Sequence, residues 1–377
     1  SNVAKAVAEL AGRPQQALTA VGAITSLPST ALTLQAGEIK YIRSGVLVDD
    51  RDYPDFPAWL SRYAGETWTT SPMPSSVGWS AVAYGNGTFV AVSGGSVAKN
   101  STVAATSVDG KAWVARTMPA SAQWTAICFG GGVFVAIARE GQIATSSDGI
   151  TWTLRTPPVI TTLCAVTYGN GRFVAVAGGN GPSAVSIVLV SVDGGATWTN
   201  HSMPTAQYWG SIAYGNGIFV AVAGLTSSAT AVATSIDGVT WTQATMPATA
   251  VWRTLAFGAG VFVAAQDSGF SVSKDGKSWS APALPPNTSS VYVEASIYAN
   301  RTFVFVSKGG QQAFLSQDGY LWDLVLGVLG TGNGNACAAN EAVVVTVGGG
   351  GSNIASISPV NLIGIKTYTK YNYLRVK

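Results

Sequence analysis

Ser235-Ile236-Asp237-Gly238-Val239-Thr240-Trp241 contains a pattern, Ser-x-Asp-Gly-x-x-Trp, that recurs along this chain. The Ser and Asp side chains can accept hydrogen bonds from nearby backbone N–H groups, and Gly tolerates a positive φ, so each copy predicts a tight turn. The Trp then supplies a large apolar face for packing. The other copies are Ser107–Trp113, Ser146–Trp152, Ser273–Trp279, Ser316–Trp322 and, with one extra residue, Ser191–Trp198. The aspartates to which we assign this structural role are Asp109, Asp148, Asp193, Asp237, Asp275 and Asp318.

A second motif alternates with these turns and predicts a β-hairpin. Its clearest copy, Gly78–Val92, has an apolar run that ends at Tyr-Gly-Asn-Gly and restarts at Phe-Val-Ala-Val. Together the two motifs give a unit of about forty residues with four strands, and such units stack radially because one sheet cannot bury both its faces. The sequence therefore predicts an all-β fold, a seven-bladed β-propeller of four-stranded antiparallel blades. The remaining copies are Gln123–Ile137, Thr162–Val176, Tyr208–Val222, Val251–Ala264, Val291–Val306 and a weaker one at Cys337–Val347.

The last unit lacks the Asp-Gly and the Trp of its turn, and the missing element occurs before the first unit. Gly65-Glu66-Thr67-Trp68 matches Gly238-Val239-Thr240-Trp241. We therefore expect this N-terminal side to donate the outer strand of the blade whose other strands lie near residues 333–358, which would close the ring and remove exposed edges. An open six-bladed ring is the alternative. The propeller is assigned to residues 61–358.

The flanking segments, residues 1–60 and 359–377, do not share the repeat, and we interpret them as a small attachment module. Asn2–Leu10 has helical spacing, residues 31–48 suggest one or two strands, and Ile363–Lys377 suggests another. The acidic stretch Asp49–Pro54 is interpreted as a solvated turn rather than a cation site.

Composition limits the classes of partner. Only 10% of the residues are charged, the net charge is +3, and there is no basic run, so no nucleic-acid partner is expected. No apolar stretch is long enough to cross a bilayer, and no secretory signal opens the chain. The neutral surface suits an extracellular or virion protein, and release by lysis would need no signal. Cys128, Cys164 and Cys337 lie in apolar runs and are interpreted as small buried hydrophobes.

The six Ser-x-Asp-Gly-x-x-Trp turns resemble the Asp-box, or bacterial neuraminidase repeat, of sialidases, sortilin-type receptors, photosystem II assembly factors and phage tail proteins. The resemblance covers about residues 65–358 and implies a fold, since one propeller fold supports many activities. The flanks Ile39–Gly45 and Tyr371–Lys377 resemble segments around propellers in bacteriophage tail-fibre or receptor-binding proteins. This implies a non-enzymatic tail or fibre component that attaches to other tail or baseplate proteins through its flanks. It would recognise a host-surface glycan or protein, and a homotrimer is expected by analogy.

Enzymatic chemistry finds little support in the sequence, and no catalytic residue, metal ligand or cofactor is predicted. The Phe/Tyr-Arg-Ile-Pro segment that precedes the repeats of sialidases is absent, and the arginines share no repeat position. A glycosidase or lyase acting on polysaccharide is an alternative that would need two carboxylates at the channel mouth, with Glu140 and Glu294 as candidates. The single histidine, His201, is interpreted as a surface residue on or after an outer strand. A protein-binding assembly scaffold is the third hypothesis.

Aromatic residues recur where the first strand of each unit begins, and equivalent positions in a propeller circle its axis. They could form a face that binds sugar or protein, because flat rings stack on sugars and anchor interfaces. The other interpretation is packing between adjacent blades. The candidates are Trp79, Trp124, Trp209, Trp252 and Tyr292, and the third unit has Thr162 instead.

Overall fold

The computed structural model describes residues 40–43, 46–49, 68–94, 100–178, 184–224, 229–285, 288, 292–307, 312–326, 333–349, 354–359 and 373–376. The chain divides into two compact units. One consists of Ser1–Glu66 with Leu362–Lys377, and the other of Thr67–Asn361. None of the described segments is a helix with the length and hydrophobicity needed to span a membrane.

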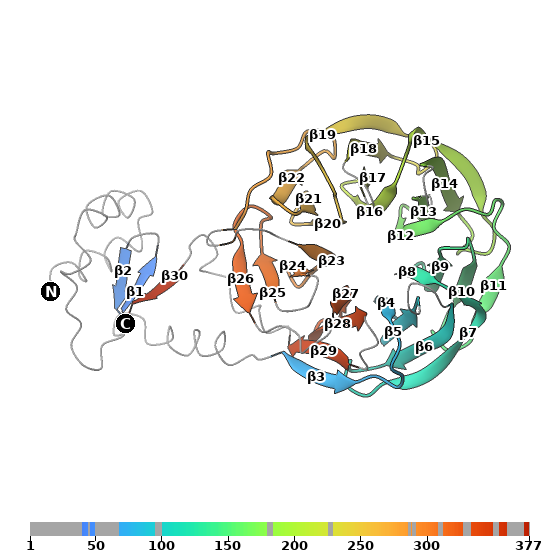
Figure 1. The fold of residues 1–377 in the computed structure, drawn as a ribbon, viewed down its shortest axis with the longest axis horizontal. Coiled ribbons are helices and arrows are strands. Elements are labelled where there is room, and N and C mark those ends of the chain that lie inside the picture. The colour runs from blue at the N-terminus through green and yellow to red at the C-terminus, as the bar shows by residue number, and fades with distance from the viewer. Residues whose placement is uncertain are drawn as a thin grey trace. The chain divides into compact units, whose positions relative to one another are not determined.

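The larger unit is a β-propeller (Figure 1). Its described residues form six four-stranded antiparallel sheets, β4-β5-β6-β7, β8-β9-β10-β11, β12-β13-β14-β15, β16-β17-β18-β19, β23-β24-β25-β26 and β27-β28-β29-β3, and one three-stranded sheet, β20-β21-β22. An all-β propeller of mostly four-stranded antiparallel sheets is thus confirmed. The strands are β3 (Thr69–Pro72), β4 (Trp79–Gly85), β5 (Thr88–Ser93), β6 (Ser101–Ser107), β7 (Val114–Ala122), β8 (Trp124–Gly130), β9 (Val133–Ala138), β10 (Ile143–Ser146), β11 (Thr153–Arg155), β12 (Leu163–Gly169), β13 (Arg172–Ala177), β14 (Val185–Ser191), β15 (Thr199–Gln207), β16 (Trp209–Gly215), β17 (Ile218–Ala223), β18 (Ala229–Ser235), β19 (Thr242–Ala250), β20 (Thr254–Gly258), β21 (Val261–Gln266), β22 (Gly269–Ser273), β23 (Val293–Ala299), β24 (Thr302–Ser307), β25 (Gln312–Ser316), β26 (Asp323–Leu326), β27 (Asn333–Ala339), β28 (Val343–Gly349) and β29 (Ile354–Pro359).

The ring closes through a strand taken from its own beginning. β3 pairs with β29 in the register Ile357↔Thr69 to Ile354↔Pro72, directly after Trp68. The first strands of neighbouring sheets also contact one another all the way round, including β27 with β4 (Figure 1). The predicted closure is therefore confirmed, and the open ring is wrong.

The sheet β20-β21-β22 departs from the prediction of four regular strands in every unit. Its outer position is taken by an irregular segment in which Ala283 forms a bridge with Phe270 and the N–H of Ser280 donates to the carbonyl of Val272. Pro282 lies between these two contacts and Pro285 follows them. Proline has no N–H to donate to a ladder, so this segment meets the sheet at separate points instead of forming a continuous strand.

The six Ser-x-Asp-Gly-x-x-Trp segments fold as the predicted turns. In the first, Asp109 Oδ1 accepts hydrogen bonds from the backbone N–H groups of Lys111 and Ala112 at 2.8 and 2.9 Å. Trp113 Nε1 donates to the carbonyl of Gly110, so the indole is fixed by its own turn. The bonds to Asp and from Trp recur in the other five turns, with the Asp193 turn one residue longer.

Neighbouring sheets pack through aromatic rings that lie on glycine. Gly85 ends β4, and a Cβ atom there would overlap the ring of Phe129 in the next sheet. Phe129 in turn packs against Phe134 of its own sheet, with ring centroids 4.7 Å apart. A larger residue at the glycine would push the sheets apart, which explains why the first strands β4, β8, β12, β16 and β20 end in glycine. The same relationship joins Gly130 to Tyr168, Gly169 to Tyr214, Gly215 to Phe257 and Gly258 to Tyr298.

The smaller unit contains one three-stranded antiparallel sheet in the order β2-β1-β30. Its strands are β1 (Lys40–Arg43), β2 (Val46–Asp49) and β30 (Tyr373–Val376). Segments near the two ends of the chain thus pair directly, with Lys40 opposite Val376. The strands expected in both flanks are confirmed there, whereas the helix expected at residues 2–10 and the acidic turn after Asp49 lie outside the described residues.

Candidate binding site

The two ends of the propeller differ in the connections that they carry. At one end, the hairpins between first and second strands lie beside the Ser-x-Asp-Gly turns, since Asn86 Nδ2 donates to the carbonyl of Ser147 in the next sheet at 2.9 Å. At the other end, which we call the loop end, the first strands begin and the second strands connect to the third. The predicted aromatic ring lies at the loop end.

Four of the predicted binding aromatics are core residues. The indoles of Trp79, Trp124, Trp209 and Trp252 have no exposed surface. Trp124, for example, packs among residues of its own sheet and also against Val92 and Met118 of the preceding sheet. The prediction that they bind a ligand is corrected, because a ring without solvent contact cannot stack on one. Packing between adjacent blades is the role that the structure shows.

Tyr292 does not belong to the ring of equivalent positions. Val293 pairs with Ser307 as Trp79 pairs with Ser93, so Val293 holds the equivalent position and is buried. Tyr292 precedes it and is 37% exposed. The third unit is corrected in the same way, because Leu163, not Thr162, holds the position in β12.

The residue that comes directly after the buried first position of the first strand is a hydroxyl residue in some sheets and a charged residue in others. In the first two sheets it is Ser80 or Thr125, whose hydroxyls bond to a carbonyl of the next sheet, Trp124 and Leu163 respectively. The ladder register places Arg253 and Glu294 at this same position in two adjacent sheets. In the sheets of Ser80 and Glu294 the position is a β-bulge, a device that redirects a side chain. At this position of the first strand, two adjacent sheets therefore carry charged residues in place of the hydroxyl residues Ser80 and Thr125.

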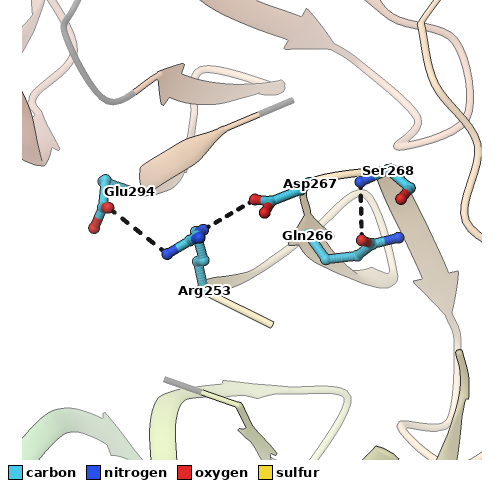
Figure 2. A network of polar contacts seen from close by, with 5 residues as sticks. All are labelled: Arg253, Gln266, Asp267, Ser268 and Glu294. Carbon is cyan, nitrogen blue, oxygen red and sulfur yellow. Dashed lines mark hydrogen bonds and ion pairs between the residues drawn. The ribbon is translucent and has the colours of Figure 1, made fainter. Parts of the chain in front are cut away.

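Arg253 is the centre of a small polar network (Figure 2). Its Nε lies 3.1 Å from Asp267 Oδ1, and its Nη1 lies 3.9 Å from Glu294 Oε1. Its guanidinium carbon lies 3.9 Å from the ring centroid of Tyr292, a cation–π contact. We call Arg253, Asp267, Tyr292 and Glu294 the Arg253 cluster.

The supports of the cluster are rigid. The N–H of Arg253 donates to the carbonyl of Ala265 in β21, so the arginine backbone is held by its own sheet. Asp267 lies in the short turn between β21 and β22, where Gln266 Oε1 accepts a 2.8 Å hydrogen bond from the N–H of Ser268 (Figure 2). The exposed fraction of the side chain is 16% for Arg253, 29% for Glu294 and 50% for Asp267. The arginine is thus fixed and mostly covered, and the aspartate is the most accessible group.

The two carboxylates of the cluster lie on either side of an arginine. The guanidinium of Arg253 lies between Asp267 and Glu294, where a sugar would have to enter (Figure 2). Glu140, the other candidate, lies between β9 and β10 and accepts a 3.0 Å hydrogen bond from the N–H of Gln123, which directly precedes β8 of the same sheet. Glu140 and Glu294 belong to different sheets, and their pairing as two catalytic carboxylates stays a prediction.

Other reactive groups have structural surroundings. Burial raises the pKa of Cys128 and Cys337 to about 12 and that of Cys164 to about 11, which keeps these thiols protonated. His201 lies on the outer strand β15, with Nε2 2.9 Å from Thr199 Oγ1. Among the residues that the structure describes, no group of three or more His, Cys, Asp or Glu side chains could hold a metal ion.

The turn aspartates are strongly hydrogen-bonded carboxylates. The hydroxyl and N–H of Thr197 lower the pKa of Asp193 to about 2, and the N–H groups of Ser278 and Lys277 lower that of Asp275 to about 2. The N–H groups of Ala112 and Thr151 lower the pKa of Asp109 and Asp148 in the same way. These carboxylates are engaged by their own turns, which is consistent with a structural role.

Sequence and structure comparisons place the chain among propellers. Residues 61–209 match the family model of the DUF6242 beta propeller domain. No curated protein matches. Similar solved structures include YCF48 bound to D1 peptide, with a TM-score of 0.62, 15% identity, and coverage of 78% of this chain and 96% of that one. A catalytically inactive virginiamycin B lyase from Staphylococcus aureus with quinupristin has a TM-score of 0.65 and 10% identity, and the match covers 77% of this chain and 99% of that one. A streptogramin B lyase has a TM-score of 0.64 and 11% identity, and the match covers 78% of this chain and 98% of that one. At these identities the likeness shows the fold alone.

Proposed function

We propose that this chain is a non-enzymatic recognition propeller, which binds a glycan or protein on a cell surface through its loop end. The observation that carries the proposal is the Arg253 cluster. It combines an exposed aromatic ring, an exposed carboxylate and a guanidinium held between two carboxylates, at the place where charged residues replace Ser80 and Thr125 in two adjacent sheets. Such a mixture of ring and hydrogen-bonding groups is typical of recognition sites.

We also propose a setting for this function. The turns are Asp-box turns, and the protein is a component of a bacteriophage tail or fibre, extracellular in the virion and assembled as a homo-oligomer, with a trimer as the working number. The pairing of β1 with β30 supports this setting, because it ties both flanks of the propeller into one separate sheet. That sheet would dock on other tail or baseplate proteins.

We count the β20-β21-β22 sheet as a full blade in this proposal. Its outer position is occupied by residues 280–283, which make the backbone contacts of an interrupted fourth strand. The propeller would then have seven blades, of which this one has the least regular outer edge.

Protein-binding scaffolding is a second candidate function. It is favoured by the similarity to YCF48, whose propeller was solved bound to a D1 peptide. An extended peptide would also use exposed aromatic and charged groups, so the loop end could serve either function. Polysaccharide cleavage is the weaker alternative, because Arg253 fills the space between the two carboxylates of the cluster.

One experiment separates these functions. The full chain is tested on an array of bacterial surface polysaccharides, and the same polysaccharides are assayed for new reducing ends after incubation. We expect retention on a subset of them without release of ends. Catalytic release would overturn the proposal in favour of an enzyme. Absence of retention on every polysaccharide and on intact cells would overturn surface recognition altogether.

A further inference from the structure

We infer that the Arg253 cluster binds a neutral sugar ring, an inference that rests on the proposed recognition function and names its ligand class. Three features of the cluster support this chemistry. They are its charge, the position of its aromatic ring and the kind of hydrogen-bonding groups around that ring.

The charge of the cluster disfavours an acidic ligand. Arg253 contributes one positive charge, whereas Asp267 and Glu294 each contribute a carboxylate within 4 Å of it. The guanidinium is thus already neutralised by its own neighbours, and the sum over the three side chains is negative. An anionic sugar would meet repulsion from Asp267, the most exposed charge of the group.

The aromatic ring provides an apolar surface of fixed orientation. Tyr292 is 37% exposed, and the guanidinium lies over its ring at 3.9 Å from the centroid. The arginine is itself held by two carboxylates, so the tyrosine packs against an immobile partner. The C–H face of a pyranose is flat and apolar and can pack against such a ring. Because the platform is ordered beforehand, little conformational entropy is lost when the sugar binds.

The polar groups beside the ring match sugar hydroxyls. Asp267 and Glu294 offer carboxylate oxygens that accept hydrogen bonds, and the guanidinium of Arg253 offers N–H donors. Its Nε and Nη1 face the two carboxylates, and the part of the chain that the structure describes provides no hydrogen-bond acceptor for Nη2. Adjacent hydroxyls of a sugar, each both donor and acceptor, can therefore bond to a carboxylate and to the guanidinium at once. A single site of this size binds weakly, and several copies in one particle would add avidity.

The test is a titration of the full chain with maltose, cellobiose and lactose, followed by saturation-transfer NMR and calorimetry, with glucuronic acid and glucosamine as charged counterparts. We expect millimolar binding of at least one neutral disaccharide, nearly independent of NaCl, because no net ligand charge is screened. Tyr292→Ala and Asp267→Asn should each weaken this binding by about tenfold or more, since each removes one side of the site. Tyr320→Ala and Glu341→Gln are the matched controls, because both residues are exposed at the opposite end of the propeller.

The outcomes distinguish the inference from the function on which it rests. Retention on the polysaccharide array that survives Tyr292→Ala and Asp267→Asn unchanged would overturn the sugar site and leave surface recognition standing. Preference for glucosamine or glucuronic acid with strong salt dependence would also overturn the inference, since the ligand class would then be charged. Loss of binding in both variants with both controls unchanged would support it.

Discussion

Asn335 Nδ2 donates a 3.1 Å hydrogen bond to the carbonyl oxygen of Trp79, a residue 256 positions earlier in the sequence. The bond joins β27 to β4 at the place where the ring closes. Asn335→Ala should lower the free energy of unfolding by about 1 kcal/mol, the usual net contribution of one hydrogen bond. Urea denaturation followed by Trp fluorescence measures this change.

The matched control for ring closure is Asn100→Ala. Asn100 Nδ2 also donates to a backbone carbonyl, that of Ser121, but the two residues belong to the same blade and the bond is exposed. We expect this substitution to change stability by less than about 0.5 kcal/mol. Equal losses in the two variants would show that the Asn335 bond has no special part in closure.

Gly85 should be intolerant of any side chain because of Phe129. Gly85→Ala places a Cβ atom inside the volume of the Phe129 ring, so we expect a loss of about 1–3 kcal/mol from overpacking. In a Phe129→Ala background the same substitution should cost much less, since the obstacle is gone. Thermal unfolding of the four proteins of this double-mutant cycle measures the coupling.

Gly87→Ala provides the comparison for that cycle. Gly87 has a φ of 75° and no atom within 4 Å of an added Cβ, so the cost there comes from backbone strain. That cost should be the same with and without Phe129. A Gly85→Ala penalty that is likewise insensitive to Phe129→Ala would contradict the packing relationship between the sheets.

Acid should destabilise the propeller through its turns. The folded-state pKa of Asp193 is lowered to about 2, whereas an unfolded Asp titrates near 4. A lowered pKa means that the stabilisation is complete above about pH 4 and is lost as the pH falls towards 2, because the folded state resists protonation. Urea midpoints measured at pH 5, 4, 3 and 2 should therefore decrease most between pH 4 and 2.

Thr197→Val tests the cause of that acid sensitivity. The hydroxyl of Thr197 donates a 2.6 Å hydrogen bond to Asp193 Oδ2 and contributes most to the lowered pKa. Without it, the pKa of Asp193 should rise towards its usual range, and the variant should lose less stability between pH 4 and 2 than the wild type. The carboxyl carbon shift of Asp193 in an NMR titration reports the pKa directly, and an unchanged value would contradict this cause.

The sequence predicts the turns because their hydrogen bonds join residues close in the chain. It predicts the ring closure because the last unit lacks an element that is present before the first unit. Every hydrogen bond of the Asp109 turn joins residues at most three apart, so the motif carries its own geometry. The closure is predictable because the last unit lacks an element that Trp68 and the residues around it supply. Both predictions depend on residues that repeat.

The Arg253 cluster could not be predicted in the same way, because it depends on departures from the repeat. Arg253 and Glu294 are 41 positions apart, and only the ladder register shows that they occupy equivalent positions in adjacent sheets. The prediction that Tyr292 holds the position equivalent to Trp79 is wrong for a related reason. The pattern favours an aromatic residue at the start of each first strand, and Val293 is buried there instead. A useful signal was present: a charged residue replaces Ser80 and Thr125 at this position.

Trp252 and Tyr292 should differ strongly in how much stability their truncation costs, because one ring is buried and the other is partly exposed. Trp252 is fully buried among Val220, Val222 and Phe262, so Trp252→Ala should cost about 3–5 kcal/mol and lower the melting temperature sharply. Tyr292→Ala removes a partly exposed ring and should change stability by less than about 1 kcal/mol. Calorimetric melting of the two variants beside the wild type measures both effects.

A Trp252→Ala protein that melts like the wild type would contradict its place in the core. A Tyr292→Ala protein that fails to fold would make Tyr292 a packing residue, and the site would then rest on Asp267 and Arg253 alone.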